Sequence, residues 1–313
     1  MISVGFVLSP RFQMMSLAAL SAFELANFTA GEALYDIALL SEGGGTAPSS
    51  LGSRLETEAI GEPAFDTVIM TGALVPEPAS PAVLDFVRAA AGRCRRVAAI
   101  CTGAFILAEA GLLDGRRATT HWSLAREMQR RFPALKMEED RIFIIDGPVW
   151  TSAGMSAGVD LALGMIEKDF GAEMARSVAR NLVLYHRRAG GQTQHSALLE
   201  MNAKSDRIQN ALDYAKRNLR SELSVEQLAE AAHLSPRQFS RAFRAETGQS
   251  PAKAVENLRV EAARLMMEQT RHPIDVVATE TGFADRERMR RAFLRAFGQP
   301  PQAIRRTARE EVA

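Results

Sequence analysis

The sequence of 313 residues predicts two domains of different class, a layered α/β domain followed by an all-α domain with two helix-turn-helix units. Short apolar runs alternate with amphipathic stretches in residues 1–185, whereas helical spacing alone, with a unit that occurs twice, fills residues 207–313. Residues 186–206 hold Gly190-Gly191 and few apolar side chains, which is typical of a linker. We therefore expect domains at 1–185 and 207–313.

Composition excludes several classes of protein. Hydrophobic residues make up 47% and charged residues 24%, as in ordinary globular domains. No stretch approaches the roughly 18 apolar residues of a membrane span, and the first residues lack signal-peptide features, so we expect a cytoplasmic protein. The two cysteines, Cys94 and Cys101, form no disulfide framework, and no paired Cys/His spacing indicates zinc. We expect neither a metal nor a cofactor.

In the first domain, five apolar runs are expected to form strands buried on both faces, as in a parallel sheet, because they lack polar alternation. They are Ser3–Leu8, Tyr35–Leu40, Asp66–Met70, Arg96–Ile100 and Arg141–Ile145. The predicted helices are Met14–Phe28, Pro81–Ala91, Phe105–Ala110, Ser123–Phe132 and Ala157–Phe170. This alternation of strands and helices predicts a layered α/β fold.

The second domain contains an internal repeat. Residues 241–243 (Arg-Ala-Phe) recur at 291–293, and residues 228–234 match residues 277–283. Each copy is predicted to form a helix, a tight turn and a second helix.

The expected turn and capping residues differ between the copies. In the first copy Ser224 and Ser235 are expected to cap the two helices, with Pro236 at the first helical position. In the second copy Gly282 suits a turn with positive φ, and Asp285 is expected to cap the following helix.

The second helix of each copy is apolar on one side and cationic on the other. The apolar positions are Phe239, Ala242, Phe243, Met289, Ala292 and Phe293. The candidate DNA-binding residues are Arg237, Gln238, Ser240 and Arg241, and then Arg286, Glu287, Arg288, Arg290 and Arg291. Such a helix fits the major groove, where arginine binds guanine bidentately and also contacts phosphate. A merely solvated charged face is the alternative for one helix, but two matched copies favour DNA.

Charge is divided unequally along the chain. Residues 205–313 carry 19 Lys and Arg against 15 Asp and Glu, whereas residues 1–204 carry 19 against 22. This division predicts that a polyanionic partner contacts the second domain.

Residues 97–105 run from an apolar strand through small residues into a helix, with Cys101 at the turn. Backbone amides and a helix N-terminus directed at the sulfur lower the pKa of a thiol and form an anion-binding pocket. Gly72 follows the strand Asp66–Met70 and His121 comes shortly after the turn, so we expect both near Cys101. This is the edge of open α/β sheets at which ligands bind. The alternative is that Cys101 and His121 are structural residues.

Two family resemblances cover nearly the whole chain. Residues 205–306 resemble the DNA-binding domain of AraC/XylS-type transcriptional regulators, on the segments 234–243, 247–251, 263–265, 274–283, 291–293 and 297–301 together with Arg259 and Arg305. Residues 1–185 resemble the flavodoxin-like DJ-1/PfpI domain (class I glutamine amidotransferase-like), on the segments 100–107, 110–122, 151–154 and 156–160. The combination is similar to the GlxA-type group of regulators.

The resemblance implies two helix-turn-helix units, joined by a helix, that enter successive major grooves. The base-reading positions it implies are Arg237, Ser240, Arg241, Arg286, Glu287, Arg290 and Arg291. Enzymes with the DJ-1-like fold hold an Asp or Glu against the elbow cysteine. Here Met15 or Ser16 stands at that position, and Glu24 lies about two turns further on. We therefore expect a ligand pocket rather than an active site, lined by Gly72, Cys101, Thr102, His121 and Trp122.

Together these observations predict a sequence-specific DNA-binding transcriptional regulator controlled by a small metabolite. The resemblance implies promoter DNA and RNA polymerase as partners, a homodimer, and a nitrogen-containing effector such as an amine or amino-acid derivative. An activator is expected, although the sequence leaves activation and repression open. Two alternatives also stay open: a hydrolase or hydratase with Cys101 as nucleophile, and a thiol redox sensor at the same residue.

Overall fold

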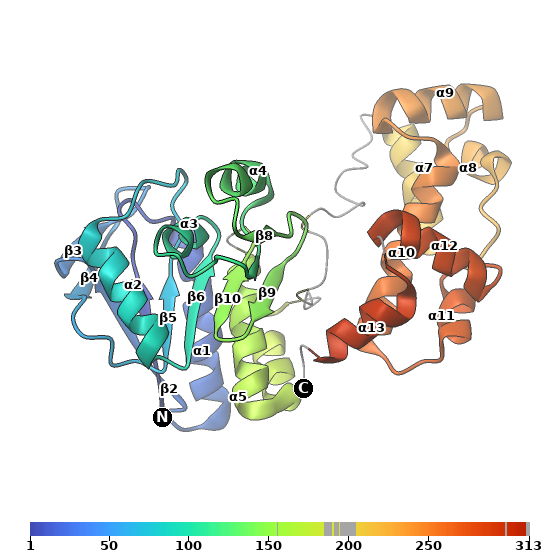
Figure 1. Cartoon of the computed structure of the whole chain (residues 1–313). Helices are drawn as coiled ribbons and strands as arrows, with labels where there is room; N and C mark the ends of the chain where they lie inside the picture. Colours follow the sequence, from blue (N-terminus) through green and yellow to red (C-terminus); the bar gives the residue numbers. More distant parts are fainter. Residues whose placement is uncertain (155, 185–189, 191–193, 195–204, 298, 311–313) are drawn as a thin grey trace. The chain divides into compact units, whose positions relative to one another are not determined.

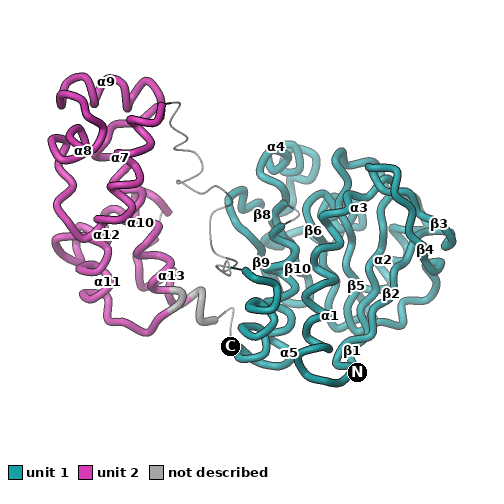
Figure 2. Tube along the Cα trace, turned by 180° about the vertical axis from the view of Figure 1, so that it is seen from behind, with its two compact units in different colours: residues 1–194, 311–313 teal, residues 195–310 magenta. Residues whose placement is uncertain are grey.

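The structure is a computed structural model that describes residues 1–313 except 155, 185–189, 191–193, 195–204, 298 and 311–313. The side chains of residues 268, 269 and 307–310 are also outside the description. The chain forms two compact units, which divide between residues 194 and 195 (Figure 2). That point lies inside the predicted linker 186–206, much of which is outside the described residues. Each unit is described by itself.

The first unit is built on an eight-stranded sheet with the order β3-β4-β2-β1-β5-β6-β10-β9 (Figure 1). The strands are β1 (Ile2–Val7), β2 (Tyr35–Ser41), β3 (Gly45–Pro48), β4 (Arg54–Ala59), β5 (Thr67–Met70), β6 (Arg96–Ile100), β9 (Phe143–Asp146) and β10 (Val149–Ser152). From β4 to β10 neighbouring strands are parallel, and only the edge strands β3 and β9 are antiparallel. The predicted parallel sheet is confirmed for four of its five expected strands, and the fifth, expected at Arg141–Ile145, is present as the antiparallel edge strand β9.

Five further strands were not expected. β3 and β4 are mostly exposed and polar, and β10 has only four residues. β7 (Arg117–Ala118) and β8 (Lys136–Met137) pair in a small separate sheet and have two residues each. Segments this short or polar have no apolar run that would predict a strand. They are strands only because they pair with other strands in the folded structure.

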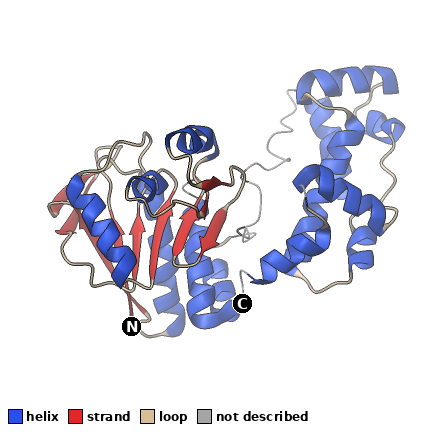
Figure 3. Ribbon diagram, in the orientation of Figure 1, coloured by secondary structure: helices blue, strands red, loops and turns tan. Residues whose placement is uncertain are grey.

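Helices cover both faces of the sheet (Figure 3). The helices are α1 (Ala18–Ala30), α2 (Pro81–Arg93), α3 (Gly103–Glu109), α4 (Trp122–Arg131) and α5 (Ala157–Asn181), and a 3-10 turn, η1, spans Met14–Leu17. α1 and α5 pack with alternate strand residues such as Phe6 and Ile100, whereas α2 and α3 pack with the intervening ones, such as Val7 and Ala99. The sheet is therefore buried on both faces. The last predicted helix ends at Phe170, and α5 does break locally at Gly171 (φ +87°) before it resumes.

The second unit is helical in its described residues. Its helices are α7 (Asp206–Arg217), α8 (Val225–Ala231), α9 (Pro236–Thr247), α10 (Pro251–Gln269), α11 (Ile274–Glu280), α12 (Arg286–Phe297) and α13 (Pro301–Glu310). Two separate cores form, one around Phe239 and Phe243 of α9 and one around Met289 and Phe293 of α12. α10 supplies Leu258 to the first core and its later residues to the second. One helix thus joins two helix-turn-helix units, as the resemblance implied. No described helix of the chain is long and apolar enough to span a membrane.

Candidate functional site

The first helix-turn-helix unit presents α9 with its apolar side inward. Phe239 and Phe243 are buried, whereas Arg237 and Arg241 are exposed and Ser240 is half-buried. The helix begins with a capping box: Ser235 Oγ accepts from the backbone N–H of Gln238, and the Gln238 side chain accepts from Ser235 N–H. Gln238, predicted as a DNA contact, is therefore exposed but also holds the start of the helix.

The second helix-turn-helix unit presents α12 in the same way. Met289 and Phe293 are buried, and all five candidate DNA-binding residues of this helix are exposed. Its cationic side carries internal ion pairs. Arg290 donates two hydrogen bonds of 2.8 Å to the two carboxylate oxygens of Glu287. These bonds, with the charges of Arg290 and its neighbours, lower the pKa of Glu287.

The other arginines of α12 have different surroundings. Asp285 caps the helix by accepting from Arg288 N–H at 2.7 Å, and its other oxygen lies 3.8 Å from the Arg288 guanidinium. Arg286 and Arg291 form no ion pair with any residue that the structure describes. The positive charge available to a polyanion is therefore smaller on this helix than its five arginines imply.

The turn of the second helix-turn-helix unit is packed against the loop after α7, within the same compact unit. Gly282 has φ +79°, and a Cβ built on it would lie 1.8 Å from the carbonyl oxygen of Leu219, in the loop after α7. Arg259 of α10 donates to the carbonyl oxygens of Leu219 and Ser221, and burial lowers the pKa of its guanidinium. This contact orients the two helix-turn-helix units relative to each other. Sequence reasoning assigned Arg259 to the joining helix but did not foresee this role.

In the first compact unit, residues 1–194, Cys101 occupies the predicted sharp turn. It has φ +55°, and its side chain is buried with the residue only 1% exposed. Its N–H donates to Ser152 O, and its own carbonyl accepts from Thr120 Oγ1 at 2.8 Å. Gly72 lies directly against the turn, because a Cβ built on it would be 3.0 Å from Cys101 Cβ and 3.0 Å from Thr102 Oγ1. The structure thus brings together three of the five predicted pocket residues.

Of the two residues expected at the position of the enzymes' acid, Met15 and Ser16, only Ser16 lies against the elbow. This residue is buried, and its hydroxyl lies 3.3 Å from both the N–H and the carbonyl oxygen of Gly72. Met15 and Glu24 are both exposed. Of the two candidates from the sequence, Ser16 is the one next to the elbow, and a serine accepts no proton from a thiol at neutral pH.

The expectation that the elbow lowers the thiol pKa is wrong. Burial raises the pKa of Cys101 to about 11, against a smaller lowering by the backbone N–H of Thr102. The loss of water around the sulfur outweighs the amides of the short helix α3. The thiol therefore stays protonated at neutral pH.

His121 and Trp122 lie at the start of α4. The imidazole caps this helix: it accepts from Ser123 N–H and shares a 2.7 Å hydrogen bond with Ser123 Oγ. The indole of Trp122 is 51% exposed and its ring centroid lies 5.5 Å from that of His121. The helix cap therefore supports the alternative that His121 is a structural residue.

A cavity of about 420 Å³ opens at the carboxyl ends of β1, β2 and β5, beside the elbow. Its inner wall is apolar and includes Val7, Met70, Val83 and Ile106. Thr102 is the one predicted pocket residue that lines it. The remaining four do not line it: Gly72 and Cys101 lie at the elbow, and His121 and Trp122 lie at the start of α4.

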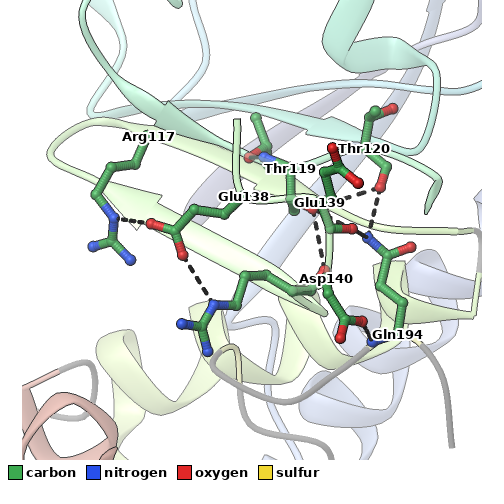
Figure 4. A network of polar contacts seen from close by, with 9 residues as sticks. Arg117, Thr119, Thr120, Glu138, Glu139, Asp140 and Gln194 are labelled. Carbon is green, nitrogen blue, oxygen red and sulfur yellow. Dashed lines mark hydrogen bonds and ion pairs between the residues drawn. The ribbon is translucent and has the colours of Figure 1, made fainter. Parts of the chain in front are cut away.

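Gln194, the last described residue of the first unit, forms a network that was not predicted from the sequence (Figure 4). Its amide nitrogen donates to Thr120 O and Glu139 O at 2.8 Å and to Thr119 Oγ1 at 3.2 Å, and its amide oxygen accepts from Trp122 N–H at 2.9 Å. Its backbone N–H donates to Asp140. The side-chain amide is thus fully hydrogen-bonded. A glutamine in a polar stretch carries no sequence signal for such a role.

Comparisons with known proteins agree with the two-part structure. Residues 20–168 match the DJ-1/PfpI family, and residues 228–307 match a helix-turn-helix domain family. The chain is 31% identical over 306 residues to the HTH-type transcriptional regulator GbdR of Pseudomonas aeruginosa, covering 96% of this chain and 83% of that protein. It is also 31% identical over 313 residues to the HTH-type transcriptional regulator GlxA of Rhizobium meliloti, covering 97% and 95%.

The solved structures show the same fold for the first unit. An AraC family transcriptional regulator from Pseudomonas putida superposes with a TM-score of 0.54 at 22% identity, over 58% of this chain and 100% of that chain. The match at this identity concerns the fold alone.

Proposed function

The chain belongs to the family of HTH-type transcriptional regulators that join a DJ-1/PfpI domain to an AraC-type DNA-binding domain, and we propose that a small metabolite bound by the first unit controls it. It is a DNA-binding regulator rather than an enzyme. Control requires that the metabolite bind one conformational state of the protein more tightly than the other. The effector itself belongs to the nitrogen-containing class that the family resemblance implied.

The proposed DNA contacts rest on one observation: both recognition helices bury their apolar side and expose their cationic side. We assign the main contacts to Arg237 and Arg241 in α9 and to Arg286 and Arg291 in α12, with Ser240 beside them. Glu287, Arg288 and Arg290 lie on the same exposed side but are engaged in ion pairs within α12. The contribution of Arg288 and Arg290 depends on exchange of their carboxylate partners for phosphate.

A promoter-fragment binding assay tests this assignment. The DNA upstream of the protein's own gene is titrated with the wild-type chain and with Arg241→Ala/Arg291→Ala at moderate salt. We expect the double variant to lose at least tenfold in affinity. Arg54→Ala/Arg176→Ala removes the same charge from exposed positions in the first unit and serves as the control. Equal affinity of the test variant and the control would contradict the assignment.

We further propose a homodimer that acts in the cytoplasm, binds promoter DNA and contacts RNA polymerase, as an activator. Three loops at the carboxyl edge of the sheet carry exposed apolar side chains that suit a second copy. They are Met15, Leu51, Leu74 and Val75. Hydrogen bonds from Gln13 N to Gly72 O and from Ser50 N to Phe12 O bring these loops together. Sedimentation of Leu51→Asp as a monomer, with wild type as a dimer, would support this surface, and a dimeric variant would contradict it.

The two alternatives that rely on a reactive thiol have a direct test. Because the folded pKa of Cys101 is about 11, we expect alkylation by iodoacetamide at pH 7 to be slower than that of the unfolded chain. The raised pKa also means that Cys101 stabilises the fold below pH 9 and loses this contribution as the pH rises toward 11. Rapid alkylation of Cys101 at pH 7 would restore the hydrolase, hydratase and redox hypotheses.

A further inference from the structure

The cavity beside the elbow has a rigid frame. Four prolines belong to its lining: Pro10 follows β1, Pro48 is the last residue of β3, and Pro76 and Pro78 lie in the loop after β5. Proline fixes φ, so these loops lose little further freedom when a ligand binds. Arg11, between Pro10 and the short bridge of Phe12 with Ala73, has φ +53°. Its positive φ places a constrained cationic residue at the cavity.

The polar groups of the wall are already hydrogen-bonded inside the protein. Ser9 Oγ donates to Thr71 O at 2.8 Å, and Thr102 Oγ1 accepts from Ala73 N–H and donates to Ala73 O. The other hydroxyls of the lining also have partners: Ser41 Oγ shares a hydrogen bond with Thr57 Oγ1, Thr46 Oγ1 donates to Glu56, and Ser80 Oγ accepts from Val83 N–H. A ligand with an apolar body therefore gains by entering the cavity, since these hydroxyls need no new hydrogen-bond partner.

Charge gathers at the exposed part of the lining. Glu42 and Glu77 are exposed there and so is Arg11, and none of the three forms an ion pair with a described residue. Two carboxylates against one guanidinium leave a net negative charge at the cavity. A cation gains from this field and an anion of the same shape loses.

We propose that this cavity is the effector site and that it binds a monocationic amine with an aliphatic or aromatic body. The body fills the aliphatic interior, and the ammonium group lies with Glu42 and Glu77. The volume of about 420 Å³ is in the range of small-molecule sites and accommodates a body of the size of a phenylbutyl group. The regulatory role of this site rests on the proposed function, but the binding itself does not.

Three probes with one body and different charges test the proposal by calorimetry on the full chain. They are 4-phenylbutylamine, 4-phenylbutanol and 4-phenylbutanoate. We expect one-to-one binding of the amine, weaker binding of the alcohol and none of the carboxylate. Glu42→Gln/Glu77→Gln should weaken the amine about tenfold and leave the alcohol unchanged. Glu32→Gln/Glu58→Gln removes two exposed carboxylates elsewhere and is the matched control.

The contrary results are equally definite. Equal binding of the amine and the carboxylate, or no saturable binding of the amine, overturns the proposal. Ala47→Phe, which fills part of the lining, should abolish amine binding, and the glutamine variants carry the test if that variant fails to fold. Promoter binding is measured on the same preparations. A protein that binds the amine but not DNA would refute the proposed function while leaving the cavity assignment intact.

A second inference rests on the Gln194 network and is independent of the cavity. Thr120 connects two parts of the first unit. Its hydroxyl donates to Cys101 O in the elbow. Its carbonyl accepts from the Gln194 side chain, as Figure 4 shows. Gln194 is the last described residue before the second unit, whose described residues begin at Ser205. We infer that Gln194 is a positioning residue that ties the start of this connection to the elbow. A shift at the elbow then moves the point from which the second unit is tethered.

Two readouts separate this role from a merely structural one. In Gln194→Ala, we expect the amide of Trp122, which donates to the Gln194 side chain, to exchange with deuterium at least tenfold faster. We also expect the affinity of the full chain for the promoter fragment to change at least threefold. Gln129→Ala removes another glutamine that bonds loop carbonyls in the first unit, and it should change neither. Unchanged promoter affinity in Gln194→Ala overturns the inference, whatever happens to its melting temperature.

Discussion

The two helix-turn-helix units share one frame but fill it with different chemistry. In the first, His233 takes the positive φ of the turn (+52°) with an exposed side chain, and Ser235 with Gln238 caps the recognition helix. In the second, Gly282 takes the corresponding position with φ +79°, and Asp285 is the cap. A histidine is possible only where nothing approaches the turn, whereas Gly282 lies against the Leu219 carbonyl.

The cationic sides differ as well. Arg237 and Arg241 of α9 have no carboxylate one helical turn away, but Arg290 of α12 is paired with Glu287 and Arg288 with Asp285. A count of arginines therefore overstates the positive potential of α12. The comparison indicates that the arginines of the first helix-turn-helix unit are free to contact DNA. Part of the positive charge of the second helix-turn-helix unit becomes available only when an internal ion pair is broken.

The largest expected effect is that of Gly282→Ala. A Cβ at this position meets backbone 1.8 Å away in addition to the strain of positive φ, so we expect a loss of about 3 kcal/mol or more in the free energy of unfolding. Gly248→Ala is the matched control, since Gly248 has φ +74° and nothing within 4 Å, and it should cost about 1 kcal/mol. Urea denaturation of both variants measures the difference. Similar losses would mean that the packing against Leu219 is unimportant.

Single arginine substitutions come next. We expect Arg241→Ala to weaken promoter binding by about 1–3 kcal/mol and Arg290→Ala by less, because Arg290 must first give up its pair with Glu287. Titration of each variant with the same promoter fragment compares them. If Arg290→Ala proves the more damaging, the pairing in α12 does not govern DNA contact.

The caps should have smaller effects. Ser235→Ala removes the hydroxyl that accepts from Gln238 N–H, and Asp285→Ala removes the carboxylate that accepts from Arg288 N–H. We expect each to lower the free energy of unfolding by about 1 kcal/mol, measured by urea denaturation. Ser240→Ala, on the same helix as Ser235 but not at a cap, should be close to neutral. A cost for Ser240→Ala equal to that for Ser235→Ala would argue against the capping role.

The smallest effect concerns the salt dependence of binding. Glu287→Gln removes the partner of Arg290, and a guanidinium released onto a phosphate steepens the slope of log affinity against log salt by about one unit. Promoter titrations at several salt concentrations measure this slope. Glu230→Gln, at an exposed position of α8, should leave it unchanged. A shallower slope in Glu287→Gln than in wild type would contradict the expectation.

Much of the fold could be predicted from patterns of residues that are close together in the sequence. The runs at Tyr35–Leu40 and Arg96–Ile100 are apolar without alternation and became buried parallel strands. The repeat and the capping residues Ser235 and Asp285 located both recognition helices. The strands β3, β4 and β10 escaped notice because their definition depends on partners distant in sequence.

The elbow shows the limit more sharply. The turn at Cys101 could be predicted from strand, small residues and helix, and the missing acid from the residues Met15 and Ser16. The pKa of the thiol could not, since helix amides and burial act in opposite directions and only the packed structure shows that burial is larger.

Patterns along the chain were enough to predict the order of the two units, the two recognition helices and their cationic sides, because local periodicity, caps and turns are encoded by residues close along the chain. The folded structure was needed to show which arginines are paired, that Gly282 lies against Leu219, where the cavity opens and which groups Gln194 binds. These features depend on distances between residues far apart in sequence, and such distances exist only once the chain has folded.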